Sequence, residues 1–244
     1  MNIMKIMANK VTKVMGNKGN QIEILHGIDL QTSSGEFLSI IGPSGSGKTT
    51  LLKCLSGLVQ PTSGTVKIDN QLLNNISERK IAKLRRTKIS YIFQSYNLLP
   101  ALSAFDNIVL PLRLSRQRIN KTKIYQLMNS LNFKADLKQL PAELSGGEQQ
   151  KVAIARALTM KAEIIFADEP TGALDSTSRQ IIFDQLRQLA DSGVCIVMVT
   201  HDIGQAAQTD RALVLNDGQV MAEVNHPTEP LLISAMNETK KAII

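Results

Sequence analysis

Short apolar runs recur along the chain, and segments with helical spacing separate them. The runs at 163–169 and 194–200 are almost continuously apolar, which is typical of strands buried on both faces of a parallel sheet. The segments whose length and composition predict strands are 36–41, 65–69, 89–93, 163–169 and 194–200.

Helical patterns fill the intervals between these runs. The segment 48–58 repeats leucine at helical spacing, and 175–190 predicts a helix between the last two strands. Residues 104–140 also look mostly helical. We expect Pro111 and Pro141 to interrupt the helices there, because proline lacks a backbone donor.

The order of these elements predicts the domain organisation. Strands that alternate with helices form a mainly parallel α/β sheet, and 211–224 adds an antiparallel hairpin with its turn at Asn216-Asp217-Gly218. We expect one domain over 1–224, with an inserted helical subdomain at about 95–160. The tail, 225–244, carries two prolines, and its pattern leaves open whether it regulates the domain or frays.

Composition limits where the protein works. The 244 residues are 43% hydrophobic and 20% charged, as in soluble globular proteins. The longest strongly apolar run, 194–199, is far short of the about 20 residues of a membrane span. The first ten residues lack the apolar core of a signal peptide. These features predict a cytoplasmic location.

Charge and cysteine content narrow the chemistry. Cys54 and Cys195 lie in apolar surroundings, which favours reduced core cysteines, and the scattered histidines and cysteines form no zinc-type cluster. The net charge of +7 suits nucleic acid, an anionic membrane surface or a nucleotide. The densest basic stretch, 79–88, reads as a solvated helix face, or as a contact for acidic lipid headgroups or a partner. Few aromatic residues are present to stack on bases.

The segment "GPSGSGKT" at 42–49 matches the phosphate-binding pattern G-x-x-x-x-G-K-[ST] in full, between a strand and a helix. Its glycines allow backbone N–H groups to face phosphate oxygens, and the helix N-terminus adds a favourable dipole. In this pattern Lys48 reaches the β- and γ-phosphates and Thr49 holds Mg²⁺. The residues expected to bind nucleotide are Gly42, Pro43, Ser44, Gly45, Ser46, Gly47, Lys48, Thr49 and Thr50.

Two acids end the apolar run "IIFADE". Asp168 and Glu169 lie at the carboxyl end of a strand, where α/β proteins place ligands. Beside a phosphate loop, Asp168 is expected to bind Mg²⁺, directly or through water, and Glu169 to orient or deprotonate the attacking water. Without that loop, the two acids would read as solvated turn residues.

The segment "LSGGEQQ" at 144–150 predicts a second anion site. Ser145 and Glu148 have the spacing of a capping box, so this segment could simply begin a helix. Gly146 and Gly147 are poor helix formers, at about 1 kcal/mol each relative to alanine. Bare backbone at a helix N-terminus suits the close approach of a phosphate.

The order of these motifs resembles the ATP-binding subunit of ABC transporters over residues 20–223. The segment 42–49 is similar to the Walker A loop, 164–170 to Walker B and 144–150 to the ABC signature. The sequence of residues 93–112 is most similar to that of the family branch for macrolide export, lipoprotein release and antimicrobial-peptide resistance. The resemblance implies a P-loop NTPase core with a mainly parallel sheet, an antiparallel β edge and an inserted helical subdomain.

The resemblance also implies a shared site. Two copies would pack head to tail, so that Ser145, Gly146 and Gly147 of one copy contact the γ-phosphate of ATP on the other. Gln94 would sense Mg²⁺ and the attacking water. His201 would contact the γ-phosphate.

Two further positions follow from the resemblance. Asp175 in "GALD" would signal between the two copies. Relatives usually carry an aromatic residue that stacks on adenine, where this chain has Met15 in "KVMG". We therefore expect weak base binding and loose discrimination among nucleotides, with simple packing of Met15 as the alternative.

Three functions compete at this point. The first is an ATP-hydrolysing transporter subunit that drives a separate membrane permease, with Leu98, Leu99 and Leu102 as candidate docking residues and a place on the inner face of the cell membrane. The second is the ATPase of a peptide-sensing or cell-envelope complex without net transport. The third is a nucleic-acid-associated ATPase. Gln94 and Ser145 are only about fifty residues apart with no heptad run between them, so no nucleic-acid partner is expected.

Overall fold

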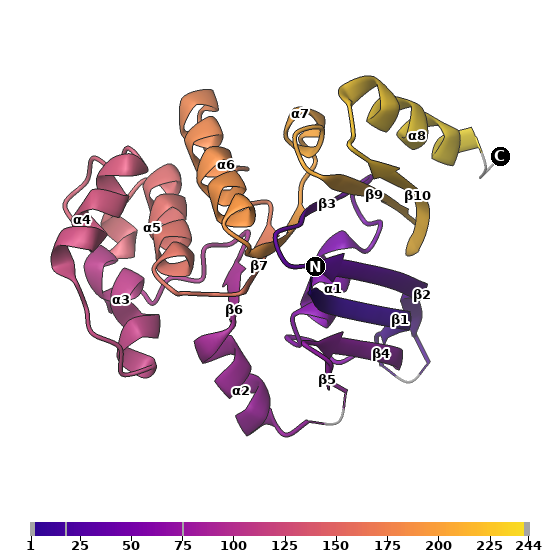
Figure 1. Ribbon diagram of the computed structural model, residues 1–244, viewed down its shortest axis with the longest axis horizontal. Helices are drawn as coiled ribbons and strands as arrows, with labels where there is room; N and C mark the ends of the chain where they lie inside the picture. Colours follow the sequence, from indigo (N-terminus) through magenta and orange to yellow (C-terminus); the bar gives the residue numbers. More distant parts are fainter. Residues whose placement is uncertain (1–2, 18, 75, 242–244) are drawn as a thin grey trace.

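The computed structural model describes residues 3–17, 19–74 and 76–241. The chain builds two sheets with helices around them (Figure 1). One sheet has four strands in the order β2-β1-β4-β5, and the other has six in the order β10-β9-β3-β8-β7-β6. The strands of the first are β1 (Met4–Met15), β2 (Ile22–Ser33), β4 (Ser63–Ile68) and β5 (Gln71–Leu72). Those of the second are β3 (Phe37–Ile41), β6 (Ile89–Ile92), β7 (Ile164–Asp168), β8 (Cys195–Val199), β9 (Arg211–Asn216) and β10 (Gln219–Asn225).

The six-stranded sheet is parallel except at one edge. Strands β9, β3, β8, β7 and β6 run parallel, and β10 pairs antiparallel with β9 through the expected hairpin. Every residue of β3, β7 and β8 is buried, because helices cover both faces of these strands. The prediction of a mainly parallel α/β sheet with an antiparallel edge is confirmed.

The four-stranded sheet is antiparallel, and the sequence pattern predicted only its strand β4. Strands β1 and β2 pair along their length, but their register shifts at four places, and Lys10 has a φ of 45°. These irregularities break the alternation of apolar and polar residues, so a period of two is not visible over 4–33. Buried Ile6, Leu25 and Ile28 still give this sheet an apolar face over the first helix.

Eight α-helices and a short 3-10 helix surround the sheets in the described part of the chain. Helices α3, α4 and α5 stand together at one end of the molecule, and α6 and α7 lie over the parallel sheet (Figure 1). The bounds are α1 (Lys48–Leu55), α2 (Glu78–Thr87), α3 (Ala104–Leu114), α4 (Lys121–Ser130), η1 (Pro141–Glu143), α5 (Gly146–Leu158), α6 (Ser176–Asp191), α7 (Ile203–Ala206) and α8 (Glu229–Lys241). No helix of the described segments is both long and apolar enough to cross a bilayer.

The expectation that Pro111 interrupts the helical region is wrong. Helix α3 continues through Pro111 to Leu114. The proline lies near the end of the helix, so the ring removes a single backbone bond in its last turn. The carbonyl of Pro111 accepts from both the backbone N–H and the hydroxyl of Ser115, at 3.0 and 2.7 Å, which stabilises this end.

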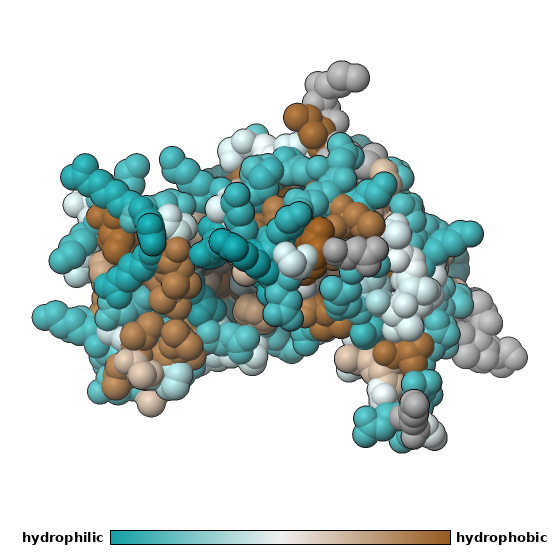
Figure 2. All heavy atoms as spheres, turned by 90° about the horizontal axis from the view of Figure 1, so that it is seen from below, coloured by the Kyte–Doolittle hydropathy of each residue, from teal (hydrophilic) through white to brown (hydrophobic). Residues whose placement is uncertain are grey.

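Helix α2 carries most of the basic stretch at 79–88, and some basic side chains of this stretch face solvent while others bond within the domain. Only Ile81 of the helix is buried, so most of its surface is solvated as expected. Arg85 instead turns inward and donates to the carbonyl of Gly57, and Lys88 just beyond the helix pairs with Asp69. The face in Figure 2 is largely hydrophilic, with its hydrophobic atoms in separate small groups.

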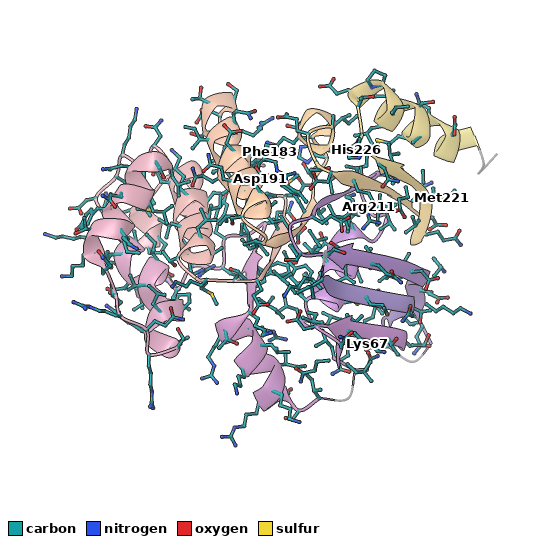
Figure 3. All side chains as sticks on the ribbon, in the orientation of Figure 1. Lys67, Phe183, Asp191, Arg211, Met221 and His226 are labelled. Carbon is teal, nitrogen blue, oxygen red and sulfur yellow. The ribbon has the colours of Figure 1, made fainter. Side chains whose placement is uncertain are left out.

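Aromatic packing joins α6 to the parallel sheet. Phe183 of α6, labelled in Figure 3, stacks on Phe37 of β3 with ring centroids 5.3 Å apart. The guanidinium of Arg187 lies 5.6 Å from the Phe37 ring centroid, so a cation–π contact adds to this packing. Phe37 and Phe183 belong to a core that continues into α3 and α5, and a second core fills the space between α1 and the two sheets.

The C-terminal segment packs against the domain. Leu232 of α8 is fully buried in a small cluster with Ala206 of α7 and Val214 of β9. Leu231 and Ile233 on the other side of α8 are about half exposed. Within 225–244, the residues of α8 therefore form an ordered helix that packs on the edge of the sheet at β9 and β10.

Four charged side chains connect the two sheets. Lys5 of β1 donates to Asp69 at 3.1 Å and to Glu163 at 2.6 Å, and Lys88 donates to Asp69 at 2.6 Å. Burial alone would raise the pKa of Asp69, but the two ammonium groups hold that pKa below its usual value. The cluster therefore stabilises the fold while Asp69 is ionised.

We expect Asp69→Asn to lower the free energy of unfolding at neutral pH by about 1 kcal/mol, because the amide keeps the left-handed turn but loses the charge. The depressed pKa in the folded state gives stability above the unfolded pKa, which is lost as the pH falls through the folded pKa. The difference from wild type should therefore shrink below roughly pH 4. Chemical unfolding across this pH range measures it. A variant of the exposed Asp184, Asp184→Asn, should change stability by less than about 0.5 kcal/mol, and an equal loss in both variants would contradict the prediction.

Candidate functional site

The loop at 42–49 packs so closely on two strands that only glycine fits at two positions. Gly42 has a φ of 151°, and a Cβ there would lie 1.9 Å from the carbonyl oxygen of Leu215. Gly47 has a φ of 96°, and its Cβ would lie 2.9 Å from the carbonyl oxygen of Ile24. The N–H of Gly218 donates to the carbonyl of Ser46 at 3.1 Å, which fixes the loop from a third direction.

Lys48 begins α1 and curls back over this loop. Its ammonium donates to the carbonyls of Gly42 and Pro43 at 2.8 and 2.7 Å. Burial lowers the pKa of Lys48, and the nearby carboxylates of Glu169 and Asp168 oppose that shift. A cation held by neutral carbonyls over a glycine loop is available to an anionic ligand that offers stronger acceptors.

A hollow of about 540 Å³ opens beside the loop and collects most of the predicted residues. Segments from five regions of the sequence line it: β2, the loop with α1, the stretch after β6, and the ends of β7 and β8. The lining residues are Ile24, Gly42, Ser44, Gly45, Gly47, Lys48, Thr49, Thr50, Gln94, Glu169, Val199 and His201. Pro43 and Ser46 belong to the same loop but do not line the hollow; Pro43 is exposed and Ser46 buried.

Thr49 and Asp168 meet beside this hollow. The Thr49 hydroxyl donates to Oδ1 of Asp168 at 2.8 Å, and both residues line a smaller hollow of about 200 Å³ with Gln94. Tyr91 approaches the other carboxylate oxygen at 3.5 Å. Burial raises the pKa of Asp168, while the Thr49 bond and nearby lysines oppose that shift.

These oxygens suit a hard cation. Mg²⁺ prefers oxygen ligands and uses one or two protein groups together with phosphate and water. A carboxylate, a hydroxyl and a side-chain amide border the same small hollow, so the residues fit Mg²⁺. Among described residues, no three His, Cys, Asp or Glu side chains are grouped as a metal site, so Mg²⁺ would need ligands beyond the acidic and histidine side chains.

Glu169 and His201 form a close pair at the mouth of the hollow. Nδ1 of His201 lies 2.7 Å from Oε2 of Glu169, and the His201 side chain is 74% exposed while that of Glu169 is 13% exposed. Glu169 has a φ of 50°, a left-handed conformation that costs about 1–3 kcal/mol for such a residue. The strained residue comes directly after β7, which ends at Asp168.

The segment 144–150 does begin a helix, as its alternative reading allows. Ser145 caps α5 by accepting from the N–H of Glu148 at 3.3 Å. The reciprocal half of the expected capping box is missing, because Oε2 of Glu148 is buried without a described partner and Oε1 lies 3.8 Å from Lys151. Ser145, Gly146 and Gly147 do not line the hollow around Lys48.

Asp175 and Met15 also lie outside this hollow. Asp175 caps α6 by accepting from the N–H of Ser178 at 2.9 Å, which supplies a structural role independent of any partner. Met15 ends β1 opposite Ile22, and its side chain is 45% exposed.

Sequence reasoning missed two apolar lining residues. Ile24 comes from β2 and Val199 from the end of β8, and both border the phosphate loop. Val199 precedes the "THD" segment by one residue, so the end of its apolar run was a usable signal. Ile24 lies in the irregular β1–β2 hairpin, whose sequence pattern gave no signal for this residue.

A phosphate loop, a strand ending in two acids and a separate glycine-rich helix start define an ATP-binding cassette of the P-loop type. The ABC transporter family matches residues 25–172, so the chain belongs to that family.

Relatives in the predicted branch share 38–42% identity with it. The macrolide export ATP-binding/permease protein MacB of Mannheimia succiniciproducens is 39% identical over 99% of this chain and 37% of its own length. The bacitracin export ATP-binding protein BceA of Halalkalibacterium halodurans is 39% identical over 91% of this chain and 89% of its own. The lipoprotein-releasing system ATP-binding protein LolD of Legionella pneumophila is 38% identical, with coverages of 91% and 99%. The chain thus spans just over a third of that MacB protein.

A solved structure supports the same fold. The ATP-binding cassette MJ0796, a dimer in a post-hydrolysis state bound to ADP and Pi, has a TM-score of 0.86 and 38% identity to this chain. The match covers 91% of this chain and 99% of that one. The predicted family and fold class are therefore confirmed.

Proposed function

We propose that this chain is the ATP-hydrolysing subunit of a membrane transporter, and that two copies close around ATP to drive a separate permease. The observation that carries this proposal is the grouping of Lys48, Thr49, Gln94, Glu169 and His201 around one hollow. These residue types are those needed to bind a triphosphate and to activate water beside it.

The residues of the hollow divide the work. Backbone N–H groups of 42–49 and the start of α1 bind the phosphates, and Lys48 exchanges its loop carbonyls for phosphate oxygens. Thr49, Asp168 and Gln94 would hold Mg²⁺, which neutralises charge on the phosphates when bound. Thr50 adds a second hydroxyl beside the loop.

Glu169 and His201 face the reacting end of the nucleotide in this proposal. Glu169 accepts a proton as water attacks the γ-phosphorus, and the bond from that phosphorus to the bridging oxygen of ADP breaks. His201 holds the Glu169 carboxylate through the 2.7 Å contact and faces the γ-phosphate with its exposed edge. Gln94 orients the attacking water.

Two copies are needed because one chain separates its two anion sites. Ser145, Gly146 and Gly147 are at the start of α5 and do not border the hollow of Lys48. A head-to-tail pair brings the signature of each copy to the ATP of the other. The dimer of the similar cassette MJ0796 supports this arrangement, and Asp175 would lie at the same interface.

The transported material is proposed from the relatives. MacB and BceA are named for macrolide and bacitracin export, and LolD for lipoprotein release. We propose export or extraction of a peptide, a lipid-linked molecule or a drug, through a permease that places this subunit on the inner face of the cell membrane. Leu99 is 46% exposed and remains the best of the three proposed docking leucines.

Light scattering of Glu169→Gln tests the shared site. The amide cannot accept the proton, so ATP should stay bound and convert a monomer into a dimer on addition of Mg-ATP. Ser145→Arg in the same background should abolish the dimer, because a bulky cation at the start of α5 blocks the approach of the other copy.

Controls separate binding from pairing. ATP binding to Ser145→Arg should stay within about twofold of wild type, since Ser145 does not line the hollow. A Glu169→Gln protein that binds ATP yet stays monomeric would contradict ATP-driven pairing of the isolated subunit.

We also propose that Met15 leaves adenine weakly bound. Met15→Tyr should tighten ATP binding by about 1–3 kcal/mol, the usual range for a base stacked on an aromatic ring. Fluorescence titration with ATP and GTP measures the change. Met221→Tyr, at another exposed methionine on β10 (labelled in Figure 3), is the matched control and should leave binding unaltered. Unchanged affinity in Met15→Tyr would show that Met15 does not contact the base.

A further inference from the structure

One buried amide of α5 is bonded to the segment that carries Glu169. Gln150 is 1% exposed, and its Nε2 donates to the carbonyls of Glu169, at 3.3 Å, and Pro170. Its Oε1 accepts from the N–H of Ala173 at 3.1 Å. All three contacts are to backbone, so Gln150 fixes the path of the chain just after the left-handed Glu169.

A guanidinium of the same helix is bonded to the segment that follows Gln94. Arg156 donates through Nη1 to the carbonyl of Asn97 and through Nη2 to the carbonyl of Tyr96, both at 2.7 Å. Tyr96 and Asn97 are consecutive residues with φ of 62° and 48°. The left-handed conformation is unfavourable for the aromatic Tyr96 and common for asparagine, so the guanidinium of Arg156 holds a turn that is strained at Tyr96.

The glycines at the start of α5 touch the same two segments. A Cβ at Gly146 would lie 3.3 Å from the Tyr96 hydroxyl, and one at Gly147 would lie 3.6 Å from the carbonyl oxygen of Ala173. Gln150 and Arg156 are six residues apart, which places them about 120° apart around the helix at 3.6 residues per turn. One rigid helix therefore contacts both segments near its start and again further along.

We propose that Gln150 and Arg156 are positioning residues of ATP hydrolysis, because they set the backbone of Glu169 and of the turn after Gln94 relative to the signature glycines. This rests on the proposed function. In the closed pair, α5 begins at the ATP of the other copy. Displacement of α5 by that ATP is then transmitted through Gln150 and Arg156 to the Glu169 and Gln94 of its own copy.

Lys151 provides a matched comparison on the same helix. It is 6% exposed and donates to the carbonyl of Asn132 at 2.8 Å, and Asn132 is also left-handed, with a φ of 52°. Asn132 follows α4 and does not line the hollow of Lys48. A merely structural role predicts similar behaviour for all three side chains of α5, whereas positioning predicts a kinetic defect for Gln150 and Arg156 alone.

The test uses the full chain and the substitutions Gln150→Met and Arg156→Lys, with Lys151→Met as control. Gln150→Met is similar in size and removes all three hydrogen bonds without adding a buried charge. Arg156→Lys loses the paired donors of the guanidinium. We expect kcat for Mg-ATP hydrolysis to fall by about tenfold to a hundredfold in both, as for other displacements of reacting groups. Equilibrium ATP binding should stay within about twofold of wild type. Lys151→Met should lower the melting temperature while kcat stays near the wild-type value.

Three outcomes would overturn the proposal. The first is an unaltered kcat in both test variants. The second is a kcat loss in Lys151→Met equal to theirs, which would make the effect one of general helix packing. The third is a loss of ATP binding that accounts for the whole defect. A wild-type chain that hydrolyses no ATP would contradict the proposed function itself, so the two failures are distinguishable.

Discussion

The close packing of the 42–49 loop between strands of the two sheets is the contact on which the rest of the structure depends. Gly42 touches Leu215 of the parallel sheet, and Gly47 touches Ile24 of the antiparallel one. The hydrogen bond from Gly218 to Ser46 ties the β9–β10 turn to the same loop. A side chain at either glycine would push the sheets apart or move the loop. The phosphate-binding backbone is thus also the joint of the fold, which explains why binding geometry and stability cannot vary independently here.

The parts of the fold that could be predicted are those whose burial leaves a simple pattern. Strands β7 and β8 are covered on both faces, so their runs are apolar throughout and easily recognised. The β1–β2 hairpin escaped because its register shifts disrupt the alternation, and only its pairing in three dimensions makes the pattern intelligible. The expectation for Pro111 was wrong for a different reason. A local rule predicted an interruption, whereas Pro111 lies in the last turn of α3, where its ring removes a single backbone bond.

The candidate site was more predictable than the fold around it. Lys48, Thr49 and Asp168 belong to short motifs whose chemistry depends on residue type and spacing, and the structure brings Thr49 and Asp168 within 2.8 Å. Contacts with backbone groups were not predictable. Lys48, Gln150 and Arg156 all donate to backbone carbonyls. Every residue has a backbone carbonyl, so the sequence does not indicate which ones will accept these bonds. A motif can also predict a bond that does not form. Ser145 and Glu148 have the spacing of a capping box, but Oε2 of Glu148 has no hydrogen-bond partner among the described residues.

Left-handed residues lie in the two segments that α5 contacts. Glu169 and Tyr96 each occupy a left-handed conformation that costs about 1–3 kcal/mol and persists only if its surroundings hold it, and Asn97 beside Tyr96 is left-handed too. Their carbonyls are held from one helix by Gln150 and Arg156, each through two donor bonds. A helix that supports strained segments on two sides has few positions that satisfy both, so a small displacement of it releases strain in both together. That restriction gives a physical reason for coupling between the two nucleotide sites. A phosphate of another copy would dock at the two glycines that begin α5, and a shift of α5 there would also move Glu169 and Gln94 around the nucleotide of its own copy.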